Sequence, residues 1–155
     1  MLELKIGNKD YKIEFSIEAS LYKDCTEQVT TLMSEMFNPD GNKSIKDVLD
    51  TMTNIPQTTL TMFYAGLLEH HGEDGDGTVL SISDAKKLIK EYIKEHKEEE
   101  SGNFFGVMKM LIEQMGNDGF FKQIGLEQVA GDVQTKAPKM PQDHKKKQAQ
   151  KHTEN

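Results

Sequence analysis

A short run of acidic residues and glycines, with the sequence GEDGDG, is the part of this chain that looks most like a metal-binding motif. In a calcium-binding EF-hand loop, oxygen ligands come from fixed positions among twelve residues, and a glycine at the sixth position allows the sharp turn. With Gly77 at the sixth position, Asp74 and Asp76 fall at ligand positions three and five. Gly72 then stands at position one and Ser83 at position twelve, where a carboxylate and a bidentate Glu are required. We therefore expect an acidic surface loop between two helices, and no metal site.

The other residues that could carry chemistry do not form a recognisable site. His70 and His71 are neighbours on an expected helix, so their side chains point about 100° apart and do not converge on one ion. Cys25 is the only cysteine, and its position in a helical apolar pattern is typical of a small buried residue. Residues 98–100 are all Glu, a charge run of the kind that stays solvated. The sequence has neither a phosphate-binding glycine loop nor a GxSxG motif. We expect no catalytic residue and no cofactor, and therefore not an enzyme.

The composition is typical of one water-soluble domain. The chain has 155 residues, of which 35% are hydrophobic and 29% are charged, which is enough for one core but not for two. Its apolar runs are only a few residues long, so we expect no contact with a membrane. The first residues lack the basic and then apolar profile of a signal peptide, which favours the cytoplasm as the location.

The net charge of -7 is unevenly distributed along the chain. Residues 1–135 contain 13 Lys against 24 acidic residues, whereas residues 136–155 contain six Lys against two acidic residues. Every basic residue is Lys, so the chain lacks the Arg side chains that bind phosphates and guanine in a bidentate manner. We therefore expect no nucleic-acid partner for the acidic part.

The chain begins with the pattern of a β-hairpin. Residues 2–6 and 11–15 alternate apolar and polar side chains, and a turn with a Gly-Asn pair lies between them. The apolar positions that share a face are Leu2, Leu4 and Ile6 on the first strand, and Tyr11, Ile13 and Phe15 on the second. A lone hairpin is marginally stable in water, so this face must pack on other elements.

Helical patterns follow the hairpin. A helix of about five turns is expected from Ser16, with a stripe formed by Ile17, Leu21, Cys25, Val29, Leu32 or Met33, and Met36. A second helix is expected from Ser44 to about Thr53, with Ile45, Val48, Leu49 and Met52 on one side. Pro56 should end it, because proline and the residue before it disfavour helix. A third helix at 57–71, apolar around much of its circumference, should be the central one.

Two further helices are expected before the composition changes. Ser81 and Asp84 form a capping box for a helix that reaches about Lys97. Another helix should run from Phe104 through Met115, with a shorter one after it. The sequence thus predicts a mainly α fold with an N-terminal β-hairpin (α+β) in a domain of residues 1–130, followed by a flexible basic tail at 131–155.

The last long helix has more apolar surface than one packing face can hide. The residues that give it this surplus are Phe104, Phe105, Met108, Leu111, Ile112 and Met115. Flexible Met and large Phe side chains suit a surface that accepts different partners, so we predict a partner-binding site here. The alternative is that this helix is simply the centre of the core.

The order of elements resembles that of the tail assembly chaperones of long-tailed, siphovirus-type bacteriophages. Members of that family typically begin with a short hairpin around an "nGkey" motif and continue directly into a helix, as IGNKDYKIEFSIEASLYKD does here. The later stretches MFYAGLLEHH and LSISDAKKLIKEYI also look like the family's "yagLl" helix and the capped helix after it. The resemblance covers roughly residues 1–95.

This resemblance implies a non-catalytic morphogenetic protein that binds the long helical tape measure protein and keeps it soluble. It further implies help in recruiting the tail tube protein, through a longer product made by ribosomal frameshifting; the stretch HKKKQ at 144–148 fits an adenine run in the gene. Such a protein acts in the host bacterial cytoplasm and is absent from the mature virion. A homo-oligomer is expected until the partner competes for the same surface.

A second class of protein is equally compatible with the composition. A small cytosolic helical adaptor, or an antitoxin-like protein-binding module, would also be acidic, helical and without catalytic groups. The neighbouring genes discriminate between the two, because a tail chaperone gene lies between a tail tube gene and a very long gene rich in coiled coils.

Overall fold

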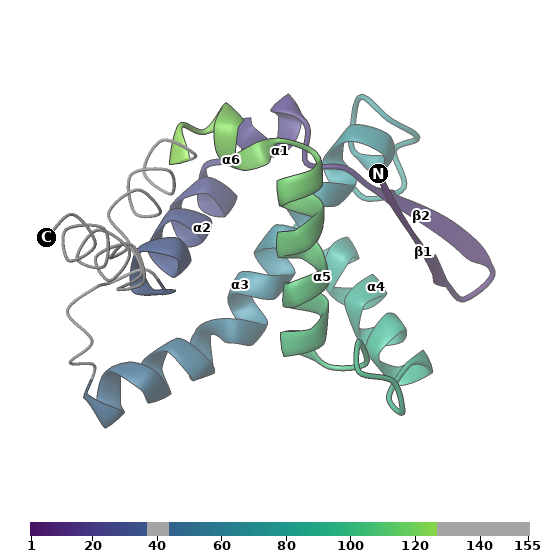
Figure 1. Cartoon of the computed structure of the whole chain (residues 1–155). Coiled ribbons are helices and arrows are strands. Elements are labelled where there is room, and N and C mark those ends of the chain that lie inside the picture. Colours follow the sequence, from purple (N-terminus) through teal and green to yellow (C-terminus); the bar gives the residue numbers. More distant parts are fainter. Residues whose placement is uncertain (37–43, 127–155) are drawn as a thin grey trace, which may run out of the picture.

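The structure is a computed structural model that describes residues 1–36 and 44–126 (Figure 1). In this part of the chain a two-stranded antiparallel sheet is followed by six helices. The elements are β1 (Leu2–Ile6), β2 (Lys9–Ile13), α1 (Ile17–Leu21), α2 (Lys23–Met36), α3 (Ile45–His71), α4 (Ile82–Glu95), α5 (Phe104–Asn117) and α6 (Phe120–Gln123). The predicted class, mainly helical with an N-terminal hairpin, is confirmed. The predicted basic tail at 131–155 lies outside the described residues.

The hairpin has the predicted apolar face, but its second strand spans Lys9–Ile13 instead of the expected 11–15, because the turn has two residues instead of four. Leu4 pairs with Tyr11, and the two-residue turn begins at Gly7, whose φ of 61° is the conformation that glycine adopts without strain. The buried face consists of Leu4, Ile6, Ile13 and Phe15. This face packs against α3 and α4, which supply the neighbours that an isolated hairpin lacks.

The first predicted helix is in fact two helices. The chain leaves helical geometry at Tyr22, whose ψ of 98° is extended, and α2 starts at the next residue. The Tyr22 ring packs edge-on against Tyr64 of α3, with ring centroids 5.3 Å apart. Because this contact turns the chain, Ile17 and Leu21 of α1 face solvent and only Ala19 is buried. The predicted continuous stripe is therefore wrong for α1 and holds for α2, where Cys25, Val29 and Leu32 are buried.

The predicted break at Pro56 is wrong, because α3 runs through it from residue 45 to residue 71. A proline removes one hydrogen bond from the helix, here the bond that the carbonyl of Met52 would accept. Ser44 and Asp47 close a complete capping box at the start of α3, and the later turns are buried in the core. These favourable contributions on both sides of Pro56 outweigh the one missing bond.

The second half of α3 and α5 form the centre of the core. Met62, Phe63 and Leu67 on α3 are fully buried, as are Leu111 and Met115 on α5. The capping box predicted at the start of α4 is present, and α4 adds Ala85, Ile89 and Tyr92 to the core. None of the helices in residues 1–36 and 44–126 combines the length and the apolar character of a bilayer span.

Candidate protein-binding surface

The first half of α3 carries an uncovered apolar stripe. Its members have exposed fractions of 81% for Ile45, 43% for Val48, 55% for Leu49 and 59% for Met52. Their spacing of three and four residues puts them on one side of the helix, as the sequence predicts. We call these four residues the α3 stripe. Figure 1 shows the first turns of α3 extending beyond the other labelled elements, so no described element packs on the stripe.

The same face of α3 is covered in its second half. Thr59 lies seven residues after Met52, which is close to two helical turns, and Thr59 is buried. Its hydroxyl donates to the carbonyl of Phe104 at 3.3 Å, so the start of α5 lies where the stripe ends. A partner helix on the α3 stripe would therefore take the place along the first half that α5 takes along the second half.

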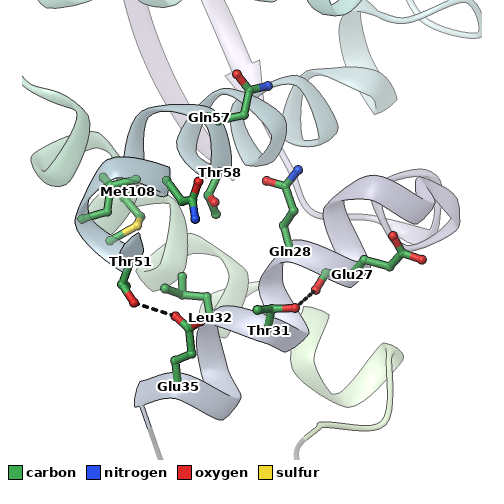
Figure 2. Close-up of a pocket in the computed structure, with 11 residues that line it drawn as sticks. Glu27, Gln28, Thr31, Leu32, Glu35, Thr51, Gln57, Thr58 and Met108 are labelled. Atoms are coloured by element: carbon green, nitrogen blue, oxygen red, sulfur yellow. Dashed lines mark hydrogen bonds between the residues drawn. The ribbon is translucent and has the colours of Figure 1, made fainter. Parts of the chain in front are cut away.

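A groove of about 360 Å³ lies between α2 and α3 (Figure 2), and it is lined on the α3 side by residues that follow the stripe or lie between its members, such as Thr51 and Ile55. Its apolar part comes from Leu32, Ile55 and Met108. The remaining lining residues are polar or acidic: Glu27, Gln28, Thr31, Glu35, Thr51, Asn54, Gln57 and Thr58. Ile55 lies seven residues after Val48 and so belongs to both the groove and the face of the stripe.

The groove is acidic and rich in hydrogen-bond acceptors. Two of the lining residues, Glu27 and Glu35, are acidic, and none of the described residues that line the groove is basic. Glu35 accepts a hydrogen bond from the Thr51 hydroxyl at 3.0 Å, and Glu27 lies 3.5 Å from Lys23 in an exposed ion pair that contributes little stability.

Gln28 presents an unmet acceptor at this groove. Its side chain extends from α2 toward α3 (Figure 2), and its Oε1 atom is buried without a hydrogen-bond partner in the described part of the chain. A buried acceptor without a partner costs about 1–3 kcal/mol, so a donor from a bound molecule would be favoured here.

The residues predicted to bind a partner on α5 do not form one surface. Met108, Leu111 and Met115 are buried in the core, Phe104 and Ile112 are half-buried, and Phe105 is 55% exposed. Leu111 and Met115 are fully buried in the core, whereas Met108 also lines the groove between α2 and α3. The surplus of apolar residues on α5 reflects its central position, where α3 and α6 both pack on it.

The sequence indicated the true exposed face only in part. The pattern placed the four residues of the α3 stripe on one side of a helix, but it carried no information on which element would cover them. The start of α5 meets α3 at Thr59, two helical turns beyond Met52, and Phe104 is not among the residues that line the groove.

The acidic loop after α3 makes hydrogen bonds and ion pairs with other parts of the same chain. Asp76 accepts hydrogen bonds from the Thr78 hydroxyl at 2.6 Å and from the Thr78 backbone N–H at 3.0 Å. It also pairs with Nδ1 of His71 at 2.9 Å and with the Lys9 ammonium at 3.2 Å. The bond from the Thr78 side chain contributes most to lowering the pKa of Asp76 well below its ordinary value.

His71 links this loop to the hairpin. Its Nε2 accepts the backbone N–H of Lys12 at 2.9 Å, so Nδ1 carries the proton that is donated to Asp76. His70 points elsewhere and contacts Glu14 at 2.6 Å. Both histidines therefore have structural roles, and residues 1–36 and 44–126 contain no group of three metal-binding side chains.

Cys25 is buried in α2, and burial raises the pKa of its thiol to about 12. A thiol with such a pKa is not a nucleophile at neutral pH.

The chain matches no family model, no curated protein and no solved structure.

Proposed function

We propose that this chain is a non-catalytic chaperone that binds helical segments of a larger protein, and that it acts as a tail assembly chaperone of a long-tailed bacteriophage. The observation that carries the proposal is the α3 stripe, a row of apolar side chains on a projecting helix that no element within residues 1–36 and 44–126 covers. Contiguous exposed apolar surface on a soluble protein typically marks an interaction site.

The geometry of the stripe favours a helix as the bound element. Ile45, Val48 and Met52 are spaced as the a and d positions of a coiled-coil seam are, and Leu49 widens the seam on one side. A second amphipathic helix would bury these side chains against its own apolar residues. The acidic exterior of residues 1–135 keeps the chaperone dispersed while its apolar surface is free.

The tape measure protein is the partner that fits the family resemblance. It is long and helical, so a chaperone must accept many related segments along it. A stripe of aliphatic residues with a flexible Met at position 52 tolerates such variation better than a shaped pocket does. In this proposal the chain acts in the host cytoplasm and is absent from the virion. A frameshifted longer form recruits the tail tube protein, and a homo-oligomer covers the stripe before the partner arrives.

Co-expression with the tape measure protein tests the proposal. We expect the tape measure protein to be soluble and to co-purify with the wild-type chain, and to be insoluble without it. Leu49→Glu should abolish this effect while the chain stays folded, because Leu49 is already half exposed. The matched control is Leu80→Glu, since Leu80 is similarly exposed but lies beside Tyr64, away from the stripe.

A tape measure protein that is equally insoluble with and without the chain would contradict the proposal. Capture of a different helical protein through the stripe, with the tape measure protein left insoluble, would instead assign the chain to the adaptor class.

A further inference from the structure

We infer that the helix bound by the α3 stripe is basic, with Lys or Arg side chains beside its apolar residues, and that Glu27 and the Gln28 amide oxygen receive them. This inference rests on the proposed function, because it specifies the chemistry of the partner at the same surface. It commits to one occupant, an amphipathic helix with cationic flanks.

The charges around the surface support a basic partner. Glu27 and Glu35 line the groove, and no described lining residue is basic, whereas Asp47 and Asp50 lie on the side of α3 opposite to the stripe. A partner helix with Lys or Arg at the edge that faces α2 would meet the carboxylates of Glu27 and Glu35. A second copy of the chain would bring the same excess of acidic residues, so a basic partner helix is favoured over a second copy at this surface.

The groove provides the polar contacts that such a partner needs. Ile55 belongs both to the groove and to the face of the stripe, so side chains at the edge of a docked helix would point toward α2. Lys and Arg have long apolar stems and charged ends, so the stems can lie over Ile55 and Leu32 while the ends reach the groove. Their N–H groups are donors only, and Gln28 Oε1 is an acceptor without a partner in the described chain.

The exposed pair between Lys23 and Glu27 does not oppose this assignment. Lys23 and Glu27 have side chains that are 82% and 63% exposed, and their atoms are 3.5 Å apart. Because such a pair contributes little, a cation on the partner can take the place of Lys23 at small cost.

Three synthetic peptides test the inference with the full chain. Each contains three heptads and is stabilised as a helix: the first has Leu at positions a and d with Lys at e and g. The second has Glu in place of every Lys, and the third keeps Lys but has Ser in place of every Leu. Binding is measured by fluorescence anisotropy in about 50 mM salt, where interactions between exposed charges are weakly screened, and in about 500 mM salt, where they are strongly screened.

We expect the Leu–Lys peptide to bind about tenfold more tightly than the Leu–Glu peptide in low salt, with a smaller difference in high salt. Leu49→Glu should abolish binding of the Leu–Lys peptide, and Leu80→Glu should leave it unchanged. Glu27→Gln and Gln28→Met should each lower the affinity for the Leu–Lys peptide a few fold and leave the affinity for the Leu–Glu peptide unchanged. Gln28→Met keeps the length of the side chain and removes only the amide.

Several results would overturn the inference. Equal affinity for the Leu–Lys and Leu–Glu peptides would exclude recognition of the peptide's charge. Tight binding of the Ser–Lys peptide would show that charge attraction alone is sufficient and that apolar contacts with the stripe are not required. Unchanged binding in both Glu27→Gln and Gln28→Met would remove the assigned acceptors. A dimer that Leu49→Glu disperses, together with no peptide binding, would assign the stripe to a second copy.

The inference and the proposed function can fail separately. If the tape measure protein is solubilised but its binding depends neither on the stripe nor on salt, the inference is wrong and the function stands. If the Leu–Lys peptide binds at the stripe while the tape measure protein remains insoluble, the surface is correct and the assigned partner is wrong.

Discussion

The two halves of α3 both carry apolar residues but lie in opposite environments. In the second half, Met62, Phe63 and Leu67 are fully buried beneath α5, α4 and the hairpin. In the first half, four apolar residues form a single stripe that faces solvent, although they belong to the same continuous helix. The second half is apolar around much of its circumference and is covered on several sides, whereas no described element covers the stripe. No element in residues 1–36 and 44–126 covers this apolar face, and for this reason we propose it as a partner-binding surface.

Truncating a leucine in each half should give the largest contrast. Leu67→Ala removes buried methyl groups and leaves a cavity, so we expect it to lower the free energy of unfolding by about 2–5 kcal/mol. Leu49→Ala changes a half-exposed side chain and should alter the free energy of unfolding by less than about 0.5 kcal/mol. Urea unfolding followed by circular dichroism measures both values.

Equal losses in the two variants would show that the first half of α3 is covered within the free protein. In that case the α3 stripe would not be available to a partner. A loss for Leu49→Ala that depends on protein concentration would point to burial between copies of the chain.

Local signals in the sequence were sufficient for the elements whose causes are local. Alternation of side chains gave the hairpin, and Ser81 with Asp84 gave the start of α4. The errors arose where distant residues decide the outcome. Tyr22 breaks the first helix because Tyr64 lies beside it, and Pro56 stays within α3 because packing compensates for one hydrogen bond.

The candidate surface was harder to predict for the same reason. Periodicity reveals which residues share a face, as it did for Leu49 and for Leu111, but not whether another element covers that face. Asp76 pairs with Lys9, which is far away in the sequence. The sequence of the loop alone therefore does not show that this carboxylate is already engaged within the fold.

A methyl group added to the second half of α3 should also destabilise the fold. A Cβ atom at Gly66 would lie 2.6 Å from Cγ2 of Ile13 and 3.2 Å from Cζ of Phe15, both of which are fully buried. Overpacking of this kind costs about 1–3 kcal/mol, which exceeds the gain of about 1 kcal/mol in helix propensity. We expect Gly66→Ala to be less stable than the wild type by about 1–2 kcal/mol, measured by urea unfolding.

Gly116→Ala in α5 is the matched control. A Cβ atom there meets no atom within 4 Å, so only the propensity gain remains and the variant should be more stable by up to about 1 kcal/mol. If Gly66→Ala were also stabilising, the hairpin would not pack as closely on α3 as the structure shows.

The hydrogen bonds at the end of α3 should give a smaller effect that depends on pH. Asp76→Asn removes a charged acceptor that is partly exposed, so we expect a loss of about 1 kcal/mol near pH 7. Because the pKa of Asp76 is lowered in the folded chain, its contribution is present above the ordinary carboxyl pKa of 3.8 and is lost as the pH falls below it. The difference in Tm between wild type and variant should therefore shrink below about pH 4.

Asp74→Asn serves as the control for this experiment. Asp74 is exposed and makes none of the hydrogen bonds that hold Asp76, so its replacement should leave Tm unchanged at neutral pH. A difference between wild type and Asp76→Asn that is constant from pH 7 to pH 3 would contradict the role assigned to the Asp76 charge.

Calcium should have the smallest effect of all, because the loop that follows α3 has no ligand set to offer. Asp76 already bonds to Thr78, His71 and Lys9, and a calcium ion would have to replace these contacts. Ser83 lies in the first turn of α4 and carries no carboxylate, so the bidentate ligand that completes an EF-hand shell is missing.

We expect saturating calcium to leave Tm unchanged, and calorimetric titration in low salt to show no binding in the sensor range. A dissociation constant at or below about 10 μM would place the loop in that range and would show that the contacts of Asp76 are exchanged for metal ligands. The loop at the end of the second half of α3 would then change its contacts when calcium binds. Both halves of α3 would be next to a binding site, and the second half could no longer be described as belonging only to a fixed core.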